Sequence, residues 1–361
     1  SGSMAAGERW WRFRVDYHAG PMDDLILDGV RPAFAAFAAQ APMAYFLRHW
    51  RRGPHLRIYV STTREALEAV VRPAIEHVVG GYLRARPSPG MADPSAFLPL
   101  HERLAELEGE DGPLMPWSPD NTIHAEGERP EPLTVRDVLL ADFYADTTPS
   151  VYHALERVRS GASLPTIAFD LVVATAHALS TGGLPVARTS LRSHAEAYLA
   201  RRSDGVRLRE LWRDHYARNR EAFTERLIAV ASSAESAENG AHLPHVREWV
   251  RRLRPIRERA RALLESGELT LEYASPAEGA RDLPSLAEVS AFHRELESRP
   301  EWARLRDSPA FGAYRLVINC TYLHLTRLGL TPHQRFLVCH LAADAAADVY
   351  GIAAHEEVAT R

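Results

Sequence analysis

The spacing of apolar residues changes once along the chain, and this change limits the folds open to it. Residues Arg9 to Tyr17 alternate large apolar side chains with arginine or aspartate, as expected of a strand with one buried face. Two further extended runs, Ala44 to Trp50 and His55 to Ser61, are joined by a short turn at residues 51–54. From about Asp146 the apolar residues recur every three or four positions, which predicts helices. We therefore expect an α+β protein.

The order of elements in the first part predicts a ferredoxin-like α/β unit. A helix over Asp23 to Ala39 follows the first strand, and Thr63 opens a second helix that runs toward Tyr82. A helix through His101 to Glu108 and a last strand near Asn121 to Ala125 complete this part. Strand, helix, hairpin, helix and strand is the βαββαβ order of that fold.

The remainder reads as a helical body. The candidate helices are Ser150–Arg159, Thr166–Ser180, Ser190–Arg201, Arg209–Ser233, Pro244–Glu265, Ser285–Ser298, Ala310–Leu328 and Pro332–Tyr350. A loop is expected over Ser232 to Gly240, and a short hairpin around Leu269 to Tyr273. We predict two parts: 4–145, an α/β module that contains the hairpin, and 146–361, a helical body. Residues 1–3 read as an expression scar.

Composition excludes several classes of function. The chain has 361 residues and a net charge of −4, so a general affinity for nucleic acid is not expected. All 43 basic residues are arginines, which a GC-rich coding sequence explains, and which also suits the recognition of carboxylates. The most apolar stretch, Thr166 to Leu179, contains Asp170 and His177 and is too short to cross a bilayer. We expect a cytoplasmic protein that binds neither nucleic acid nor membrane.

No cofactor or metal motif is present. The sequence lacks a phosphate-binding loop, a dinucleotide-binding glycine pattern, an HExxH motif and a GxSxG motif. The 17 histidines are scattered, and Cys320 and Cys339 do not form a CxxC pair. We predict that the protein needs no metal and no cofactor.

Three constellations of polar residues remain as candidate sites. The first is the hairpin from Tyr45 to Ile58, which places Arg48 on one face of its first strand and His55 and Arg57 on one face of the second. An inward-pointing arginine needs a carboxylate or an amide-rich ligand. A solvent-exposed polar face explains the same pattern, so both interpretations stay open.

The second constellation lies on the helix expected over Ala310–Leu328. Arg315, Asn319 and Tyr322 fall on one polar stripe of a helix that is otherwise apolar, and His324 lies nearby. Such a stripe either lines a pocket or is half exposed to solvent. The third is the helix opened by Ser285, where Ser290 and His293 interrupt an apolar stripe. Ser290 either marks a polar spot in the core or bonds back to its own helix.

These segments resemble a known family. The Trp-rich first strand, the hairpin and the run Tyr322-Leu323-His324-Leu325-Thr326-Arg327-Leu328-Gly329 look like the C-terminal, glutamate-eliminating domain of lanthipeptide dehydratases, and more narrowly like its stand-alone thiopeptide-type bacteriocin relatives. Arg48, His55 and Arg57 match the family's hairpin positions. Tyr322 stands where that family has a first histidine and Thr326 where it has asparagine, while His324 and Arg327 are kept.

This departure makes the pyridine synthases of thiazolyl peptide antibiotics the nearest branch. The resemblance implies a cofactor-free, formal aza-[4+2] cycloaddition between two dehydroalanines of a ribosomal peptide, with loss of water and of the leader. It implies Tyr322, His324 and Ser290 as catalytic candidates. The residues expected to bind substrate are Arg48, Arg57, His55, Asn319, Arg315 and His293.

The resemblance also implies partners. The main partner is the precursor peptide, a leader joined to a modified core, and transient contact with other biosynthetic enzymes is expected as well. Arg51 and Arg52 are the predicted leader contacts, because such leaders tend to be acidic, so part 4–145 is expected to carry the surface near the leader. Part 146–361 is expected to complete the active-site pocket. Seven arginines between Arg247 and Arg261 form a second basic surface, which also reads as an ordinary solvated face. The rival functions are a glutamate-elimination enzyme that forms dehydroalanine and a non-catalytic scaffold that binds leaders.

Overall fold

The computed structural model describes residues 6–130, 133–236, 243–270 and 285–352. These residues form two compact units, one running to Gly161 and the other beginning at Ala162. The point at which the sequence becomes helical, Asp146, lies inside helix α7 (Val135–Arg159), which belongs wholly to the first unit.

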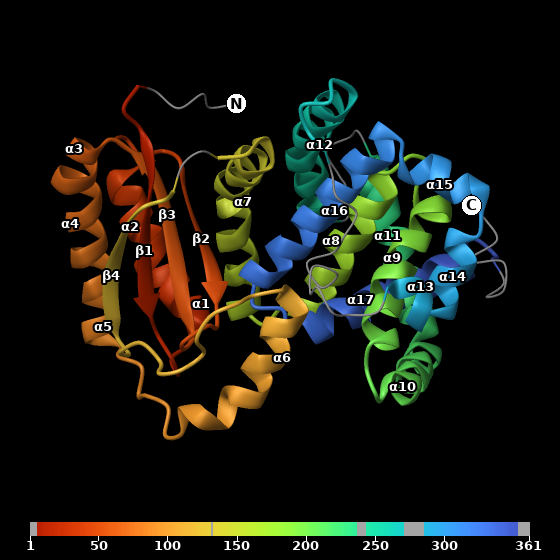
Figure 1. The fold of residues 1–361 in the computed structure, drawn as a ribbon, viewed down its shortest axis with the longest axis horizontal. Helices are drawn as coiled ribbons and strands as arrows, with labels where there is room; N and C mark the ends of the chain where they lie inside the picture. The colour runs from red at the N-terminus through yellow and green to blue at the C-terminus, as the bar shows by residue number, and fades with distance from the viewer. Residues whose placement is uncertain (1–5, 131–132, 237–242, 271–284, 353–361) are drawn as a thin grey trace. The chain divides into compact units, whose positions relative to one another are not determined.

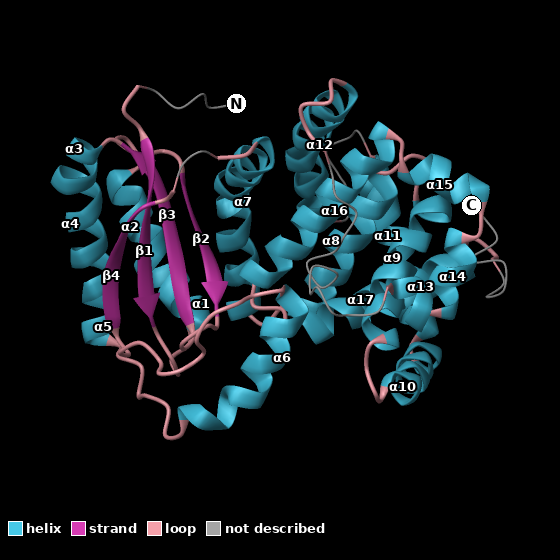
Figure 2. Ribbon diagram, in the orientation of Figure 1, coloured by secondary structure: helices cyan, strands magenta, loops and turns pink. Residues whose placement is uncertain are grey.

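The first unit is built on a four-stranded antiparallel sheet (Figure 2). The strands are β1 (Arg9–Asp16), β2 (Ala44–His49), β3 (His55–Thr62) and β4 (Thr122–Glu128), in the spatial order β2-β3-β1-β4. This is the order of a ferredoxin-like sheet, so the predicted fold class is confirmed. Each predicted strand is present within a few residues of its expected bounds.

One face of this sheet is apolar and is covered by two long helices. Phe13, Ile58 and Phe46 lie side by side across three strands, because Ile58 is paired with both of the others. All three are buried, and Phe34 of the first helix packs against Phe46 with ring centroids 6.3 Å apart. Alternation along the strands therefore fixes which residues enter this core.

Both long helices contain widened, π-helical turns. The first consists of α1 (Met22–Leu25), a π turn at Ile26–Val30 and α2 (Arg31–Phe37). The second consists of α3 (Arg64–Ala66), a π turn at Leu67–Val71, α4 (Arg72–Ala74), a π turn at Ile75–Val79 and α5 (Gly80–Ala85). Pro32 and Pro73 each follow a π turn. Proline lacks an N–H and crowds the carbonyl four residues earlier, and a widened turn relieves that crowding.

The other face of the sheet is polar at one end and aromatic at the other. Tyr45 of β2 stacks on Tyr59 of β3 at 4.8 Å and on Tyr144 of α7 at 5.0 Å. The polar end, which includes Arg57 and His55, lies on the same face as the loop that follows α6 (Leu98–Glu108).

The second unit is made of helices (Figure 1). They are α8 (Leu164–Ala178), α9 (Leu184–Ala200), α10 (Gly205–Arg218), α11 (Arg220–Glu235), α12 (Pro244–Glu265), α13 (Leu286–Val289), α14 (Ala291–Glu297), α15 (Pro300–Arg306), α16 (Pro309–Arg327) and α17 (Pro332–Val349). Every residue of helix α8 from Ile167 to Ala176 is buried, so this helix forms the centre of this core. No helix within the described ranges is long and apolar enough to cross a membrane.

Several helix boundaries differ from the prediction. The helix expected over Arg209–Ser233 is two helices, divided at Asn219, and the one expected over Ser285–Ser298 is divided at Ser290. Helix α15 was not predicted, and α7 begins at Val135 rather than Ser150. The predicted loop from Ser232 begins later, since α11 continues to Glu235. The rest of that loop, and most of the hairpin expected around Leu269 to Tyr273, lie outside the described residues.

Candidate active site

Arg57 and His55 form a fixed pair on the polar face of the first unit's sheet. Nδ1 of His55 lies 2.8 Å from the carbonyl oxygen of Gly53, so it carries the proton, and Nε2 accepts from Nε of Arg57 at 3.3 Å. Burial lowers the pKa of His55 to about 2, so the ring stays neutral. His55 therefore positions Arg57 and does not itself titrate near neutral pH.

Arg48 lies on the opposite face of the same sheet. It stands beside Leu56, on the side covered by α1, and its Nη2 atom contacts Oδ1 of Asp23 at 2.5 Å. Burial lowers the pKa of Arg48, and the carboxylate opposes that shift. The hairpin thus does not bring Arg48 together with His55 and Arg57.

Arg51 and Arg52 occupy the hairpin turn, where both hold neighbouring loops. Nη1 of Arg51 donates to the carbonyl oxygen of Asp111 at 2.6 Å, and Nε of Arg52 donates to that of Pro116 at 2.9 Å. Both side chains remain partly exposed. Their guanidinium groups can therefore still meet a charged ligand, although part of their hydrogen-bonding capacity is used.

A polar pocket lies beside this turn. It is lined by Arg12, Phe13, Arg51, Arg57, Tyr59, Glu110 and Glu126. Nε of Arg12 is buried there and has no hydrogen-bond partner among the described residues. Arg12 was not predicted as a site residue. Its position two residues before Arg14 on an alternating strand nevertheless places both arginines on the polar face.

One group of potential metal ligands occurs in the described part of the chain. The ligand atoms of His49, Glu108 and Glu110 all lie within 4.8 Å of one another. However, Nδ1 of His49 accepts the backbone N–H of Arg51 at 3.0 Å, so the ring proton sits on Nε2, which contacts Glu110 at 2.6 Å. A histidine ligand needs an unprotonated nitrogen toward the metal and normally donates from the other. The local hydrogen bonds therefore oppose metal binding.

In the second unit, Ser290 and His293 form a chain of hydrogen bonds with a serine of α9. Oγ of Ser290 caps α14 by accepting the backbone N–H of His293 at 3.2 Å, and it lies 2.7 Å from Nδ1 of the same residue. Nε2 of His293 lies 3.0 Å from Oγ of Ser193. Ser290 therefore marks a polar spot in the core, one of the two interpretations left open by the sequence.

Burial controls the charge of this chain. Ser290 and His293 are almost completely buried, whereas Ser193 is partly exposed. Desolvation lowers the pKa of His293 to about 4, so its ring is neutral at neutral pH. A neutral imidazole between two hydroxyls can accept a proton at one nitrogen while it donates from the other.

Tyr322 lies between α9 and α17. Its ring stacks on His194 of α9 with centroids 4.2 Å apart, and Arg335 of α17 lies 5.8 Å from the ring centre. Its hydroxyl oxygen accepts from the thiol of Cys339 at 3.5 Å. Burial raises the pKa of Tyr322 well above its usual value, so the phenol keeps its proton. His194, Cys339 and Arg335 were not predicted as neighbours of Tyr322, because they come from two other helices and their packing on α16 is a tertiary contact.

His324 faces the other side of α16. Its ring lies 4.3 Å from that of Trp249 on α12, and Nδ1 contacts Nη2 of Arg327 at 3.0 Å. Positions two apart on a helix are separated by about 200° around the axis, so Tyr322 and His324 cannot share one face. The expectation that His324 lies close to the polar stripe is therefore wrong. Burial and the charge of Arg327 lower the pKa of His324 well below its usual value.

The remaining residues of the α16 stripe lie nearer the surface. Asn319 is exposed and Arg315 is half-buried, whereas Tyr322 is buried. The stripe is therefore buried at Tyr322 and exposed to solvent at Asn319. Neither of the two interpretations that the sequence allowed holds for the whole stripe.

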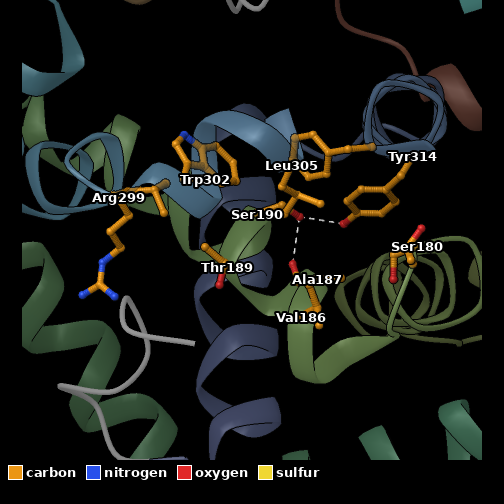
Figure 3. Close-up of a pocket in the computed structure, with 12 residues that line it drawn as sticks. Ser180, Val186, Ala187, Thr189, Ser190, Arg299, Trp302, Leu305 and Tyr314 are labelled. Atoms are coloured by element: carbon orange, nitrogen blue, oxygen red, sulfur yellow. Dashed lines mark hydrogen bonds between the residues drawn. The ribbon is translucent and has the colours of Figure 1, made fainter. Parts of the chain in front are cut away.

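A second pocket lies close to the N-terminal half of α16 (Figure 3). At one end Oγ of Ser190 contacts the hydroxyl of Tyr314 at 2.6 Å and donates to the carbonyl oxygen of Ala187 at 2.9 Å. Trp302 and Leu305 of α15 form another side. This pocket was not predicted, because the helix that carries Trp302 was not predicted either.

Comparison with known proteins identifies the class. A family model described as lantibiotic biosynthesis dehydratase C-term matches residues 10–346, so the chain belongs to this family. The resemblance inferred from the sequence is thus confirmed at the level of the family.

Solved structures narrow the comparison. The chain is 88% identical to the pyridine synthase TbtD from thiomuracin biosynthesis, with a TM-score of 0.83 over 96% of this chain and 100% of that one. It is also similar to TsrL, at 20% identity and a TM-score of 0.69 over 97% of this chain and 98% of that one, which shows a shared fold. No relative was found among the curated proteins.

Proposed function

We propose that this protein is a pyridine synthase, which joins two dehydroalanines of a thiazole-containing ribosomal peptide into a six-membered ring. The observation that carries the proposal is the 88% identity to TbtD over nearly all of both chains. The departure at Tyr322 from the histidine of the eliminating enzymes supports it as well, because a phenol with a raised pKa is a poor base for removing an α-proton.

The reaction sets clear demands on the site. One dehydroalanine amide must move its proton from nitrogen to oxygen to become an iminol, which makes a 2-azadiene. Two carbon–carbon bonds then form with the second alkene. Water leaves from the former amide carbon and the leader departs as a carboxamide, so the ring becomes aromatic. Holding both alkenes in one pose contributes most, since effective molarity is worth roughly 7–11 kcal/mol at best.

The chain Ser290–His293–Ser193 suits the proton transfers. The iminol step needs one group to accept a proton from nitrogen and another to return a proton to oxygen. A neutral imidazole held between hydroxyls at 2.7 and 3.0 Å meets this need without developing a stable charge. Ser290 and His293 are buried, which keeps competing water away. In this proposal the two hydroxyls carry protons between the substrate and His293.

Tyr322 suits the role of a hydrogen-bond donor. Its hydroxyl has a weak thiol contact within the protein, and its raised pKa keeps the proton in place. A phenol of this kind can stabilise negative charge that develops on an amide or departing oxygen. His324, packed on Trp249, remains a catalytic candidate without a contact that favours it.

The first unit is proposed to bind the peptide. Arg57, fixed by His55, can donate to carbonyl groups of the substrate, and Arg51 and Arg52 can meet acidic residues of the leader. Arg48 is already joined to Asp23, so we assign it to the packing of α1. The proposed partner is therefore the precursor peptide.

The family match is also compatible with a second function, that of a glutamate-eliminating enzyme that forms dehydroalanine. Three peptides separate the possibilities: a glutamylated peptide, a dehydroalanine peptide and a leader alone. A pyridine synthase converts only the second, with mass losses of water and leader. Loss of glutamate from the first peptide would instead establish the eliminating enzyme. Binding of the leader without conversion of either modified peptide would identify a scaffold.

A further inference from the structure

A buried carboxylate lies beside the chain Ser290–His293–Ser193. Glu196 follows Ser193 by three positions on α9, so the two side chains are neighbours one turn apart on the surface of this helix. Ser193 contacts Nε2 of His293 at 3.0 Å, and α14 packs on α9. Only 8% of Glu196 is exposed. Taking a carboxylate out of water costs several kcal/mol, so a charge at this depth has to be compensated by its surroundings.

Glu196 forms an ion pair with α10. Arg209 donates to both carboxylate oxygens, from Nε at 3.1 Å and from Nη2 at 2.5 Å. Burial raises the pKa of Glu196, but the hydrogen bonds and charge of Arg209 outweigh burial, so the net pKa is lowered and the carboxylate is ionised at neutral pH. The side chain of Arg209 is 23% exposed against 11% for that of Glu196, so water screens the arginine more strongly. The negative charge of Glu196 therefore still acts on His293, where it favours the protonated ring.

Two arginines of α9 also lie near this chain. Arg192, the other charged residue within one turn of Ser193, contacts Asp344 of α17. Arg201, at the end of α9, has a buried Nη1 atom without a hydrogen-bond partner among the described residues. Its positive charge opposes protonation of His293. Helix α9 thus places one negative and one unpaired positive group where both act on the same imidazole.

The charged residues on α14, and on α13 and α15 beside it, are exposed or paired. Exposed charges are screened by water and contribute little. Within the described ranges, Glu196 is therefore the carboxylate with the largest effect on His293. The exposed residues are Glu288, Arg294, Glu295, Glu297, Glu301 and Arg304, and the half-buried Arg306 pairs with Asp307 at 3.3 Å.

We propose that Glu196 is a positioning residue of the reaction, whose buried negative charge stabilises His293 while a proton passes through its ring. The inference rests on the proposed function, in which the substrate nitrogen gives up a proton and the oxygen receives one. One ring nitrogen of His293 gains a proton and the other loses one, so the ring is positively charged only between the two transfers. A negative charge fixed in the interior lowers the energy of that state and leaves the neutral ring almost unaffected. Glu196 touches no reacting atom in this arrangement and acts through His293.

Titration of His293 provides a test that does not need turnover. The ring is followed by NMR between about pH 3.5 and 7, with its signal assigned by its loss in His293→Gln. Glu196→Gln should lower the pKa of His293 and Arg201→Gln should raise it, because the two variants remove charges of opposite sign. Glu297→Gln is the matched control: this glutamate lies one turn from His293 on α14 but is exposed, so the pKa should not change. Equal titration of His293 in wild type and Glu196→Gln would overturn the inference.

Turnover separates this role from a purely structural one. Glu196→Gln should lower kcat for the dehydroalanine peptide about tenfold and leave KM within about twofold, since the charge acts in the proton transfers and not in binding. Glu196→Asp keeps the charge and should recover most of kcat. Arg209→Gln breaks the same ion pair but retains the carboxylate, so it should lower stability to urea about as much as Glu196→Gln while kcat stays within about threefold of wild type. If Arg209→Gln lowers kcat as much as Glu196→Gln, the ion pair has only a structural role and the inference is wrong.

The outcomes also separate this inference from the proposed function. If the wild type fails to convert the dehydroalanine peptide but Glu196→Gln lowers the pKa of His293, the proposed function fails and the control of His293 by Glu196 stands. If the wild type converts the peptide and Glu196→Gln does so at the same rate, the proposed function stands and the role given to Glu196 is wrong.

Discussion

Replacement of Tyr322 by phenylalanine tests the chemical role of its hydroxyl. Among the residues that the structure describes, this hydroxyl has one weak contact, the thiol of Cys339 at 3.5 Å. The ring keeps its stacking on His194 and its place beside Arg335 when the hydroxyl is removed. We therefore expect the free energy of unfolding to change by less than about 1 kcal/mol.

The effect on turnover should be much larger. If the hydroxyl donates to an oxygen that gains charge in the transition state, its loss costs about 1.5–3 kcal/mol, which corresponds to a decrease in kcat of roughly 10- to 150-fold. Leader affinity should stay within about twofold of wild type, because the leader contacts are proposed to lie in the other unit.

Tyr216→Phe supplies a matched control. Tyr216 is another buried phenol of the second unit, and its hydroxyl donates to Asp348 at 2.5 Å. Removing this strong contact should lower the free energy of unfolding by about 1–3 kcal/mol and leave kcat near wild type. Turnover is followed by mass spectrometry, stability by urea unfolding and leader binding by fluorescence polarisation. Wild-type turnover in Tyr322→Phe, or a loss of stability as large as its loss of activity, would refute the chemical role.

Three further predictions follow from charge and protonation. Because burial lowers the pKa of His293 to about 4, its neutral, basic form persists above that pH, so kcat should stay level down to about pH 5 and fall toward pH 4. Circular dichroism checks that the protein stays folded over this range. A kcat–pH profile with its midpoint near pH 6.5 would contradict the assignment of His293. Leader binding should weaken as salt rises, since exposed pairs are screened over about 8 Å, and reversing Arg51 and Arg52 to glutamate should weaken it more than reversing Arg257 and Arg261, which already pair with glutamates of their own helix. Salt-independent affinity with both double variants binding normally would show that apolar or backbone contacts hold the leader. Chelators should leave turnover unchanged, and inactivation by EDTA that one added divalent ion reverses would overturn the cofactor-free mechanism.

Local periodicity was enough to predict the sheet of the first unit and the two long helices that cover it, whereas the first fifteen residues of α7 were missed. The strands and the two long helices of the sheet follow from alternation and from capping residues such as Thr63. The errors in the second unit came from breaks that periodicity does not show. The apolar residues on either side of Ser290 keep a helical spacing in the sequence, yet the Ser290 side chain caps a new helix and so divides the predicted one.

The candidate site was predictable only where its residues lie on one element. Ser290 and His293 are three positions apart at the start of one helix, so the sequence alone predicted that they lie close together. Ser193 contacts His293 and His194 contacts Tyr322, but both come from a helix about a hundred residues earlier, and no local pattern links them to their partners. The separation of Tyr322 from His324 was available from helical geometry alone, because two positions turn the side chain by about 200°.

The strand order of the first unit also has a consequence for how the chain folds during synthesis. Strand β1 is synthesised first and lies between β3 and β4. Asp16 of β1 can pair with Thr122 of β4 only after β4 has been synthesised. Closing so long a loop costs entropy before the pairing stabilises it, and sheets that depend on distant partners fold slowly. Until β4 emerges, one edge of β1 is open, and this strand carries Trp10, Trp11 and Phe13. A nascent chain halted before β4 therefore presents an apolar, unpaired strand edge, which is the form most prone to aggregate with other chains.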